Sequence, residues 1–386
     1  MKKTSVILSL ILILSNFFLY GQDTINRLSI PEKKQIKYLD IRFENGIMLS
    51  NDTKVGDQLV NSSYYNGLDV RLGFRKSNPY DVYSNVYRRP YFGVGWYIST
   101  FHNADVGKPH ALYFFLSLPI KFEKNKRFTS SYTAAFGLSY NFNPYDSINN
   151  PANIFIGSYK NCYVHLGYVA NFKFNDKWAM NGTIGFKHFS NGSFKQPNLG
   201  INLIPFTLGV SYRFADDEIY QFPTEKPKYI KHNIVNLSFA AGSKNYEAGE
   251  ENYLKTVFGI NYLRQINYKY RIGIGMDVFY SAFSGLRNNS DASSFSKSFS
   301  VAVVGSWEWV LTKKIFVPIG LAFYLHRNEE NNEREVYYER AGIGYRFTDH
   351  LSARLTIKAH KGVADIFEWT IGYAFHKDPN SYKIDL

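Results

Sequence analysis

Apolar and polar residues alternate with a period of two along much of the chain. In residues 128–143, aromatic and aliphatic side chains alternate with small polar ones, and residues 90–100 show the same pattern. Successive side chains of a β-strand point to opposite faces, so each segment is predicted to be a strand with one apolar and one polar face. Charged residues such as Asp40, Arg42 and Glu44 lie on the polar face. In a membrane barrel such a face lines the interior.

This alternation predicts an all-β fold, an antiparallel transmembrane β-barrel. About eight strands are expected in the first half, at 38–49, 64–75, 90–100, 110–123, 128–143, 161–174, 177–190 and 201–214. A second set of about eight is expected between 232 and 376. The final strands of the two halves, TLGVSYRF and TIGYAF, are similar, which indicates an internal duplication. The strands form either two closed barrels or one barrel of sixteen, and the length of the segment between the halves favours two.

The first residues, MKKTSVILSLILILSNFFLYG, have the order of a secretory signal peptide: positive charge, an apolar run and a small residue. An uncleaved membrane anchor is the alternative. The predicted organisation is a signal peptide at 1–21, a barrel at 22–214, a periplasmic linker at 215–231, a second barrel-like repeat at 232–376 and a C-terminal tail at 377–386.

Composition agrees with an exported barrel. The chain has 31 Tyr and 32 Phe in 386 residues, although its mean hydropathy is slightly negative. Aromatic girdles and an apolar exterior, balanced by a polar interior, explain that combination. The net charge of +13 would suit nucleic acid in a cytoplasmic protein, but for an exported barrel the nearer anion is lipopolysaccharide phosphate, so no nucleic-acid partner is expected. The single cysteine excludes an internal disulfide.

The stretch GFKHFSNGSFKQPNLGIN, residues 185–202, concentrates the candidate chemistry. Continuing the alternation of the seventh and eighth strands places His188, Ser190 and Asn202 on the lipid-facing side of one hairpin. Polar groups facing lipid are costly unless paired. A serine with an adjacent histidine base, oriented by a third group, could perform nucleophilic catalysis. Ordinary turn composition is the alternative explanation of the same residues.

The segment HFSNGSFKQPNLGIN resembles the signature of the lipid A 3-O-deacylase family, which includes acyloxyacyl hydrolase-like proteins. The resemblance covers about residues 38–214. It implies an eight-strand outer-membrane barrel that removes an ester-linked acyl chain from lipid A without a metal or other cofactor. It also implies that His188 is the general base and Ser190 the nucleophile. The oxyanion-hole donors that it implies are Asn198, Asn191 and Gly192.

One position departs from the family pattern. The usual acid, about twelve residues after the serine, corresponds to Asn202, and an amide cannot stabilise an imidazolium by charge, so we expect slower turnover. In the second half, His360 and Glu368 fall on the inward face, where a polar network inside the barrel is expected. The second half is therefore predicted to be a non-catalytic copy.

The leading hypothesis is an outer-membrane serine esterase of a Gram-negative bacterium, exported through a cleaved signal peptide and acting on lipopolysaccharide among outer-membrane lipids. The main alternative is a non-catalytic barrel with a structural, adhesive or lipid-binding role, which the amide at Asn202 favours. A sixteen-strand pore is the third alternative. Homodimer formation, the acyl position that is cleaved and the role of the second half stay open.

Overall fold

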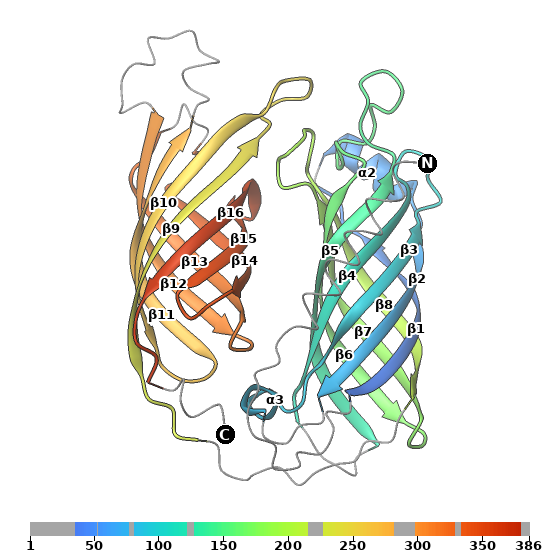
Figure 1. Cartoon of the computed structure of the whole chain (residues 1–386). Coiled ribbons are helices and arrows are strands. Elements are labelled where there is room, and N and C mark those ends of the chain that lie inside the picture. The colour runs from blue at the N-terminus through green and yellow to red at the C-terminus, as the bar shows by residue number, and fades with distance from the viewer. Residues whose placement is uncertain are drawn as a thin grey trace, which may run out of the picture. The chain divides into compact units, whose positions relative to one another are not determined.

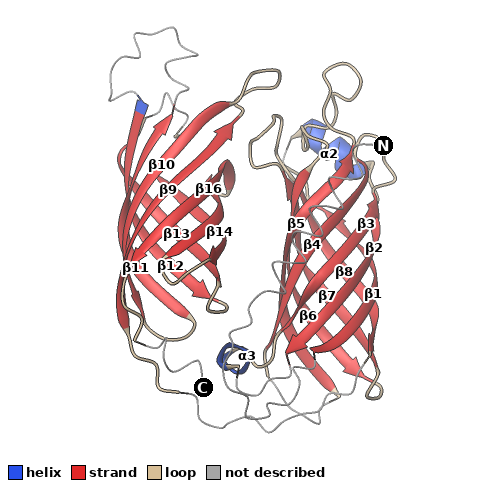
Figure 2. Cartoon of the chain, viewed as in Figure 1, coloured by secondary structure: helices blue, strands red, loops and turns tan. Residues whose placement is uncertain are grey.

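The computed structural model describes residues 35–51, 53–76, 81–121, 127–214, 227–281, 298–328 and 333–379. The predicted signal peptide lies outside these residues, as do most of the predicted linker and the end of the C-terminal tail. Figure 1 and Figure 2 show each half of the chain as a cylinder of strands, blue to green in the first half and yellow to red in the second.

Each half forms a closed antiparallel barrel of eight strands. The first barrel consists of β1 (Gln35–Met48), β2 (Asn66–Lys76), β3 (Tyr91–Thr100), β4 (Gly107–Pro119), β5 (Phe128–Phe142), β6 (Asn161–Lys173), β7 (Trp178–Ser190) and β8 (Ile201–Arg213). The second consists of β9 (His232–Lys244), β10 (Tyr253–Gln265), β11 (Tyr270–Ser281), β12 (Phe299–Val310), β13 (Ile315–His326), β14 (Tyr337–Arg346), β15 (Leu351–His360) and β16 (Val363–Phe375). The prediction of two closed barrels is confirmed, and a single barrel of sixteen strands is wrong.

Closure occurs where the last strand of each half pairs with the first. β1 pairs with β8 over the register from Tyr38–Arg213 to Met48–Leu203, and β16 pairs with β9. The strand limits agree with the alternation pattern to within a few residues. The largest difference is β4, which begins at residue 107 and ends at 119 rather than spanning 110–123.

Two short helices in the connections were not predicted. In α2 (Lys54–Asn61), the Thr53 hydroxyl accepts a hydrogen bond from the Gly56 N–H. In α3 (Val82–Val86), the Asp81 carboxylate accepts one from the Ser84 N–H. Such side-chain caps satisfy the free N–H groups of a helix start. Helices of one or two turns carry too short a periodic pattern to be distinguished from a polar loop.

The outer face of each barrel is apolar. Along β7 the exposed side chains include Trp178, Met180, Ile184 and Phe186, while Asn181, Thr183 and Lys187 between them are buried. This is the reverse of a soluble protein, where exposed strand positions are polar, and it is the arrangement of a membrane barrel. Among the described residues, no helix is long and apolar enough to cross a membrane.

On the side of His188, the interior of the first barrel is filled by aromatic and charged side chains. Tyr113 and Phe189 pack against Tyr163 with ring centroids 4.9 and 5.5 Å away. The ammonium group of Lys187 lies 2.5 Å from a carboxylate oxygen of Glu44. The same carboxylate accepts a hydrogen bond of 2.8 Å from the Tyr97 hydroxyl. An eight-strand barrel filled in this way is a packed core rather than a channel.

The second barrel contains a charged network of its own. Asp277 and Glu368 both form ion pairs with Arg340, at 2.5 and 2.6 Å. His360 is buried and lies within hydrogen-bond distance of Tyr324 and Glu333. The expectation that His360 and Glu368 belong to an inward polar network is therefore confirmed.

The Lys187–Glu44 pair gives a test of the interior. Replacing Lys187 by Met leaves the Glu44 carboxylate buried without its cation, so we expect a loss of about 3–5 kcal/mol in the free energy of unfolding. The double variant Lys187→Met/Glu44→Gln removes both charges and should recover most of that loss. Urea unfolding of the protein in detergent micelles measures both values. Equal stability of the single variant and the wild type would contradict the assignment.

Candidate functional site

The β7–β8 hairpin places the three predicted polar residues on one outer face of the first barrel. His188 and Asn202 are direct partners across the two strands, and Ser190 lies two positions after His188. Residues two apart on a strand share a face, and cross-strand partners have Cβ atoms about 5 Å apart. The structure thus brings together residues that the sequence separates by a loop.

The three side chains form a continuous hydrogen-bonded chain. His188 Nδ1 lies 2.6 Å from Asn202 Oδ1, and His188 Nε2 lies 2.8 Å from Ser190 Oγ. Because the Asn202 oxygen can only accept, it selects the tautomer in which Nδ1 carries the proton. Nε2 is then left as the acceptor for the Ser190 hydroxyl. This is the arrangement that a histidine needs to act as the base for a serine.

Two asparagines organise the loop between the strands. The Asn191 side chain bonds Ser158 Oγ and the carbonyl of Lys195, and its oxygen accepts from the Lys195 N–H. Its backbone N–H donates to Asn198 Oδ1 at 2.9 Å. Asn191 is therefore engaged within the loop. Because the Asn198 oxygen accepts this bond, its Nδ2 group is the part of the side chain that can donate to a ligand, as an oxyanion donor must.

Two glycines of the loop have backbone conformations that side chains rarely adopt. Gly192 has φ +63° and Gly200 has φ +77°. A Cβ added to Gly200 would lie 2.6 Å from His188 Cε1 and 3.1 Å from the carbonyl oxygen of Phe189. Gly200 is thus the backbone surface against which the imidazole rests. The alternation pattern did not identify this role; the positive φ that a turn demands of glycine is the only signal that could have suggested it.

Cys162 is the direct cross-strand partner of Ser190 on β6, and Val164 is the partner of His188. The buried Tyr163 lies between them and points inward, so Cys162 lies on the outer side of the barrel with Val164. Its position beside Ser190 was missed, because the pairing of β6 with β7 joins residues 28 positions apart.

Three neighbouring residues of the second barrel are of types that can bind a metal ion. Ligand atoms of Glu333, His360 and Asp365 lie within 4.8 Å of one another. Lys358, however, lies 2.7 Å from Glu333 and 3.0 Å from Asp365, and Lys255 pairs with both carboxylates. The lysines supply the positive charge that a metal would bring, so this group is an ion-pair network.

Comparison with known families shows to which proteins this chain is related. A model of the lipid A 3-O-deacylase family matches residues 69–211, and a model of the acyloxyacyl hydrolase C-terminal domain matches residues 233–377. The chain belongs to this family. The resemblance predicted from the serine and histidine motif is confirmed, and the two family models correspond to the two barrels. The family comprises hydrolases that act on acyl esters of lipid A.

Comparisons with individual proteins add little to this assignment. No curated protein matches the chain. Among solved structures, an outer membrane channel from Pseudomonas putida F1 is 10% identical over 92% of this chain and 100% of that one, with a TM-score of 0.19. A BenF-like porin from Pseudomonas fluorescens Pf-5 is 7% identical over 90% and 99%, with a TM-score of 0.21.

Gly200 offers a test of the site geometry. We expect Gly200→Ala to leave the barrel folded but to displace the His188 ring, because the added methyl group would overlap the imidazole and the positive φ disfavours alanine. Ester hydrolysis should fall on the order of 10²-fold, the loss expected when a reacting group is misplaced by about 1 Å. Hydrolysis of a chromogenic acyl ester in micelles measures it, with Gly249→Ala in a connection of the second barrel as the control. Full activity of Gly200→Ala would contradict the geometry.

Proposed function

We propose that the first barrel is an outer-membrane serine esterase that removes an ester-linked acyl chain from lipid A. The observation that carries this proposal is the hydrogen-bonded chain from Asn202 through His188 to Ser190, on the outer face of a barrel of this family. An apolar exterior around this chain suits a substrate that approaches from within the membrane.

In the proposed reaction the Ser190 oxygen attacks the ester carbonyl and its proton passes to His188 Nε2. The oxyanion that forms is stabilised by the Asn198 amide, and the Gly192 N–H is a second candidate donor. One such donor contributes about 3 kcal/mol to transition-state stabilisation. His188 then returns the proton to the departing sugar oxygen, which breaks the ester bond. Water hydrolyses the acyl-serine, releasing the fatty acid and restoring Ser190.

In this scheme Asn202 takes the orienting role that an acidic residue has in a catalytic triad. Its oxygen holds the imidazole in the reactive tautomer at 2.6 Å, but it carries no charge to stabilise the imidazolium. Triads in which an amide takes this place are known in cysteine proteases. Asn191 acts as a positioning residue, because it holds the backbone that presents Asn198.

The lengths of the connections support one orientation in the membrane. The end of the first barrel that carries His188 also carries the long connections 49–65 and 143–160, whereas residues 174–177 form a tight turn at the opposite end. In bacterial outer-membrane barrels the longer loops are extracellular. We call the hydrogen-bonded side chains of Asn202, His188 and Ser190 the reactive chain. We place it in the outer leaflet, where lipid A is presented. Both barrels are then exported through the predicted signal peptide.

The second barrel is proposed to be non-catalytic. Its candidate histidine, His360, is buried against Glu333 and Tyr324 instead of lying beside a serine on the outer face. The residues of this candidate site form hydrogen bonds and ion pairs with one another inside the barrel.

Removing the nucleophile tests the proposed activity. We expect Ser190→Ala to abolish lipid A deacylation, a loss of at least about 10³-fold, because no other hydroxyl lies within reach of His188 Nε2 among the described hydrogen bonds. Mass spectrometry of lipid A from cells that express each form measures the effect. Ser147→Ala changes an exposed serine in the connection 143–160 and should behave as the wild type. Identical acylation in cells with wild type and Ser190→Ala would leave a lipid-binding barrel as the function.

Substitutions at position 202 test the role of the Asn202 amide. Asn202→Asp keeps the shape of the side chain and adds a charge beside the imidazole, so kcat should rise on the order of tenfold, well below the roughly 10⁴-fold effect of the reverse change in a serine protease. Asn202→Leu should reduce kcat because it removes the orienting hydrogen bond. Steady-state hydrolysis of purified lipid A in micelles gives both values. If Leu and Asn support equal kcat, Asn202 does not orient the base.

A further inference from the structure

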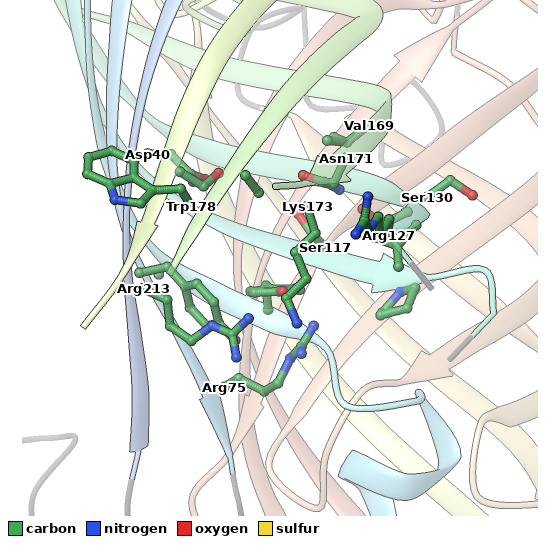
Figure 3. A pocket seen from close by; sticks show the side chains of 18 of the residues that line it. Asp40, Arg75, Ser117, Arg127, Ser130, Val169, Asn171, Lys173, Trp178 and Arg213 are labelled. Atoms are coloured by element: carbon green, nitrogen blue, oxygen red, sulfur yellow. The ribbon is translucent and has the colours of Figure 1, made fainter. Parts of the chain in front are cut away.

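The first barrel contains a cavity that the proposed esterase does not use. It has a volume of about 650 Å³ and opens at the end of the barrel where β1, β3, β5 and β7 begin. We name it the basal cavity; its lining includes Arg75, Ser117, Arg127 and Arg213, shown in Figure 3. Ser190 lies at the opposite end of β7 from the cavity-lining Trp178. A volume of this size matches ordinary small-molecule sites.

The interior between the cavity and the reactive chain is filled. The aromatic cluster of Tyr113, Tyr163 and Phe189 and the Lys187–Glu44 pair occupy the interior on the side of the reactive chain. A ligand in the basal cavity therefore enters from the end opposite Ser190, and its binding is independent of the proposed function.

Positive charge dominates the lining. Among the described residues of the lining, seven are Lys or Arg and two are Asp, an excess of five positive charges. Both aspartates already form ion pairs: Asp40 with Arg42 at 2.9 Å and Asp176 with Lys173 at 2.8 Å. The two described carboxylates of the lining are thus paired with Arg42 and Lys173. Several like charges around one partly enclosed space repel one another more strongly than they would in water.

Two of the guanidinium groups converge on one aromatic side chain, Tyr38. The Arg75 and Arg213 Cζ atoms lie 5.8 and 5.9 Å from the ring centroid of Tyr38, and Arg75 lies 3.7 Å above the ring of Tyr91. In Figure 3 the guanidinium ends of Arg75 and Arg213 point toward the same space. Stacking on aromatic faces holds these guanidinium groups in place.

A third arginine of the lining, Arg42, can still donate a hydrogen bond. Arg42 is 5% exposed and lines the cavity, and its Nε atom has no hydrogen-bond partner within the part of the chain that the structure describes. A buried N–H without a partner is costly, and an acceptor atom in the cavity would satisfy it.

From these features we propose that the basal cavity binds a phosphate anion. Guanidinium groups bind phosphate oxygens with two parallel hydrogen bonds, and a planar fork held on an aromatic ring loses little freedom on binding. The hydroxyl groups of Thr129 and Ser130 add neutral donors to the lining, whereas the Ser117 hydroxyl already donates to Thr133. The phosphate belongs either to a soluble molecule that enters the barrel mouth or to a phospholipid headgroup at the membrane surface on that side.

Binding of inorganic pyrophosphate to the full-length protein tests the site. Isothermal titration calorimetry in zwitterionic micelles at low salt should detect binding to the wild type, weakening as salt is raised. Arg75→Gln/Arg213→Gln should weaken it on the order of tenfold or more. The matched control Lys54→Gln/Lys108→Gln removes the same charge from exposed positions at the other end of the barrel and should bind as the wild type.

A second pair of substitutions separates binding from folding. Lys121 and Arg127 are exposed at the cavity mouth, so Lys121→Gln/Arg127→Gln should leave the barrel intact and still weaken pyrophosphate binding. Ester hydrolysis, which depends on the other end of the barrel, should be unchanged in both cavity variants. Undetectable binding to the wild type, or equal binding by wild type and both cavity variants, would overturn the proposal.

The source of the phosphate is distinguished by adding phosphatidylglycerol to the micelles. If a lipid headgroup occupies the cavity, the apparent affinity of the wild type for pyrophosphate falls through competition. An unchanged affinity identifies a soluble anion as the ligand.

Discussion

Pairing of the first strand of each half with its last strand is the constraint on which the other features depend. When β1 pairs with β8 and β9 with β16, every strand has two neighbours and the sheet has no free edge. Closure also divides each strand into an inner and an outer face, because side chains alternate between them. The outer positions are apolar, as in a membrane barrel, and the charged side chains at inner positions pair with one another.

That division explains why the reactive chain lies where it does. His188 and Asn202 are outer residues at the same level of neighbouring strands, so their side chains meet outside the barrel, beside an apolar surface. Lys187, one residue earlier, points inward and pairs with Glu44. The same strand thus stabilises the interior with one side chain and supports the proposed chemistry with the next.

The two barrels of one duplicated chain have used the same division differently. In the first, the interior is aromatic near the reactive chain and open and cationic at the other end. In the second, Glu333 and Asp365 bind lysines from the strands, and the candidate histidine joins them. The polar groups of the second barrel thus pair with one another inside it rather than on an outer face.

The sequence by itself determined the strands, their inner and outer faces and the residues of the reactive chain. It could do so because alternation is local and a change of one position would reverse every side chain. Only the tertiary structure decided that the sheets close as two barrels, that Gly200 supports the imidazole and that Cys162 lies beside Ser190. It alone also gathered Arg75 and Arg213 around Tyr38. These contacts join residues on different strands, and the partner of a given side chain across a barrel depends on closure and register, which no local pattern records.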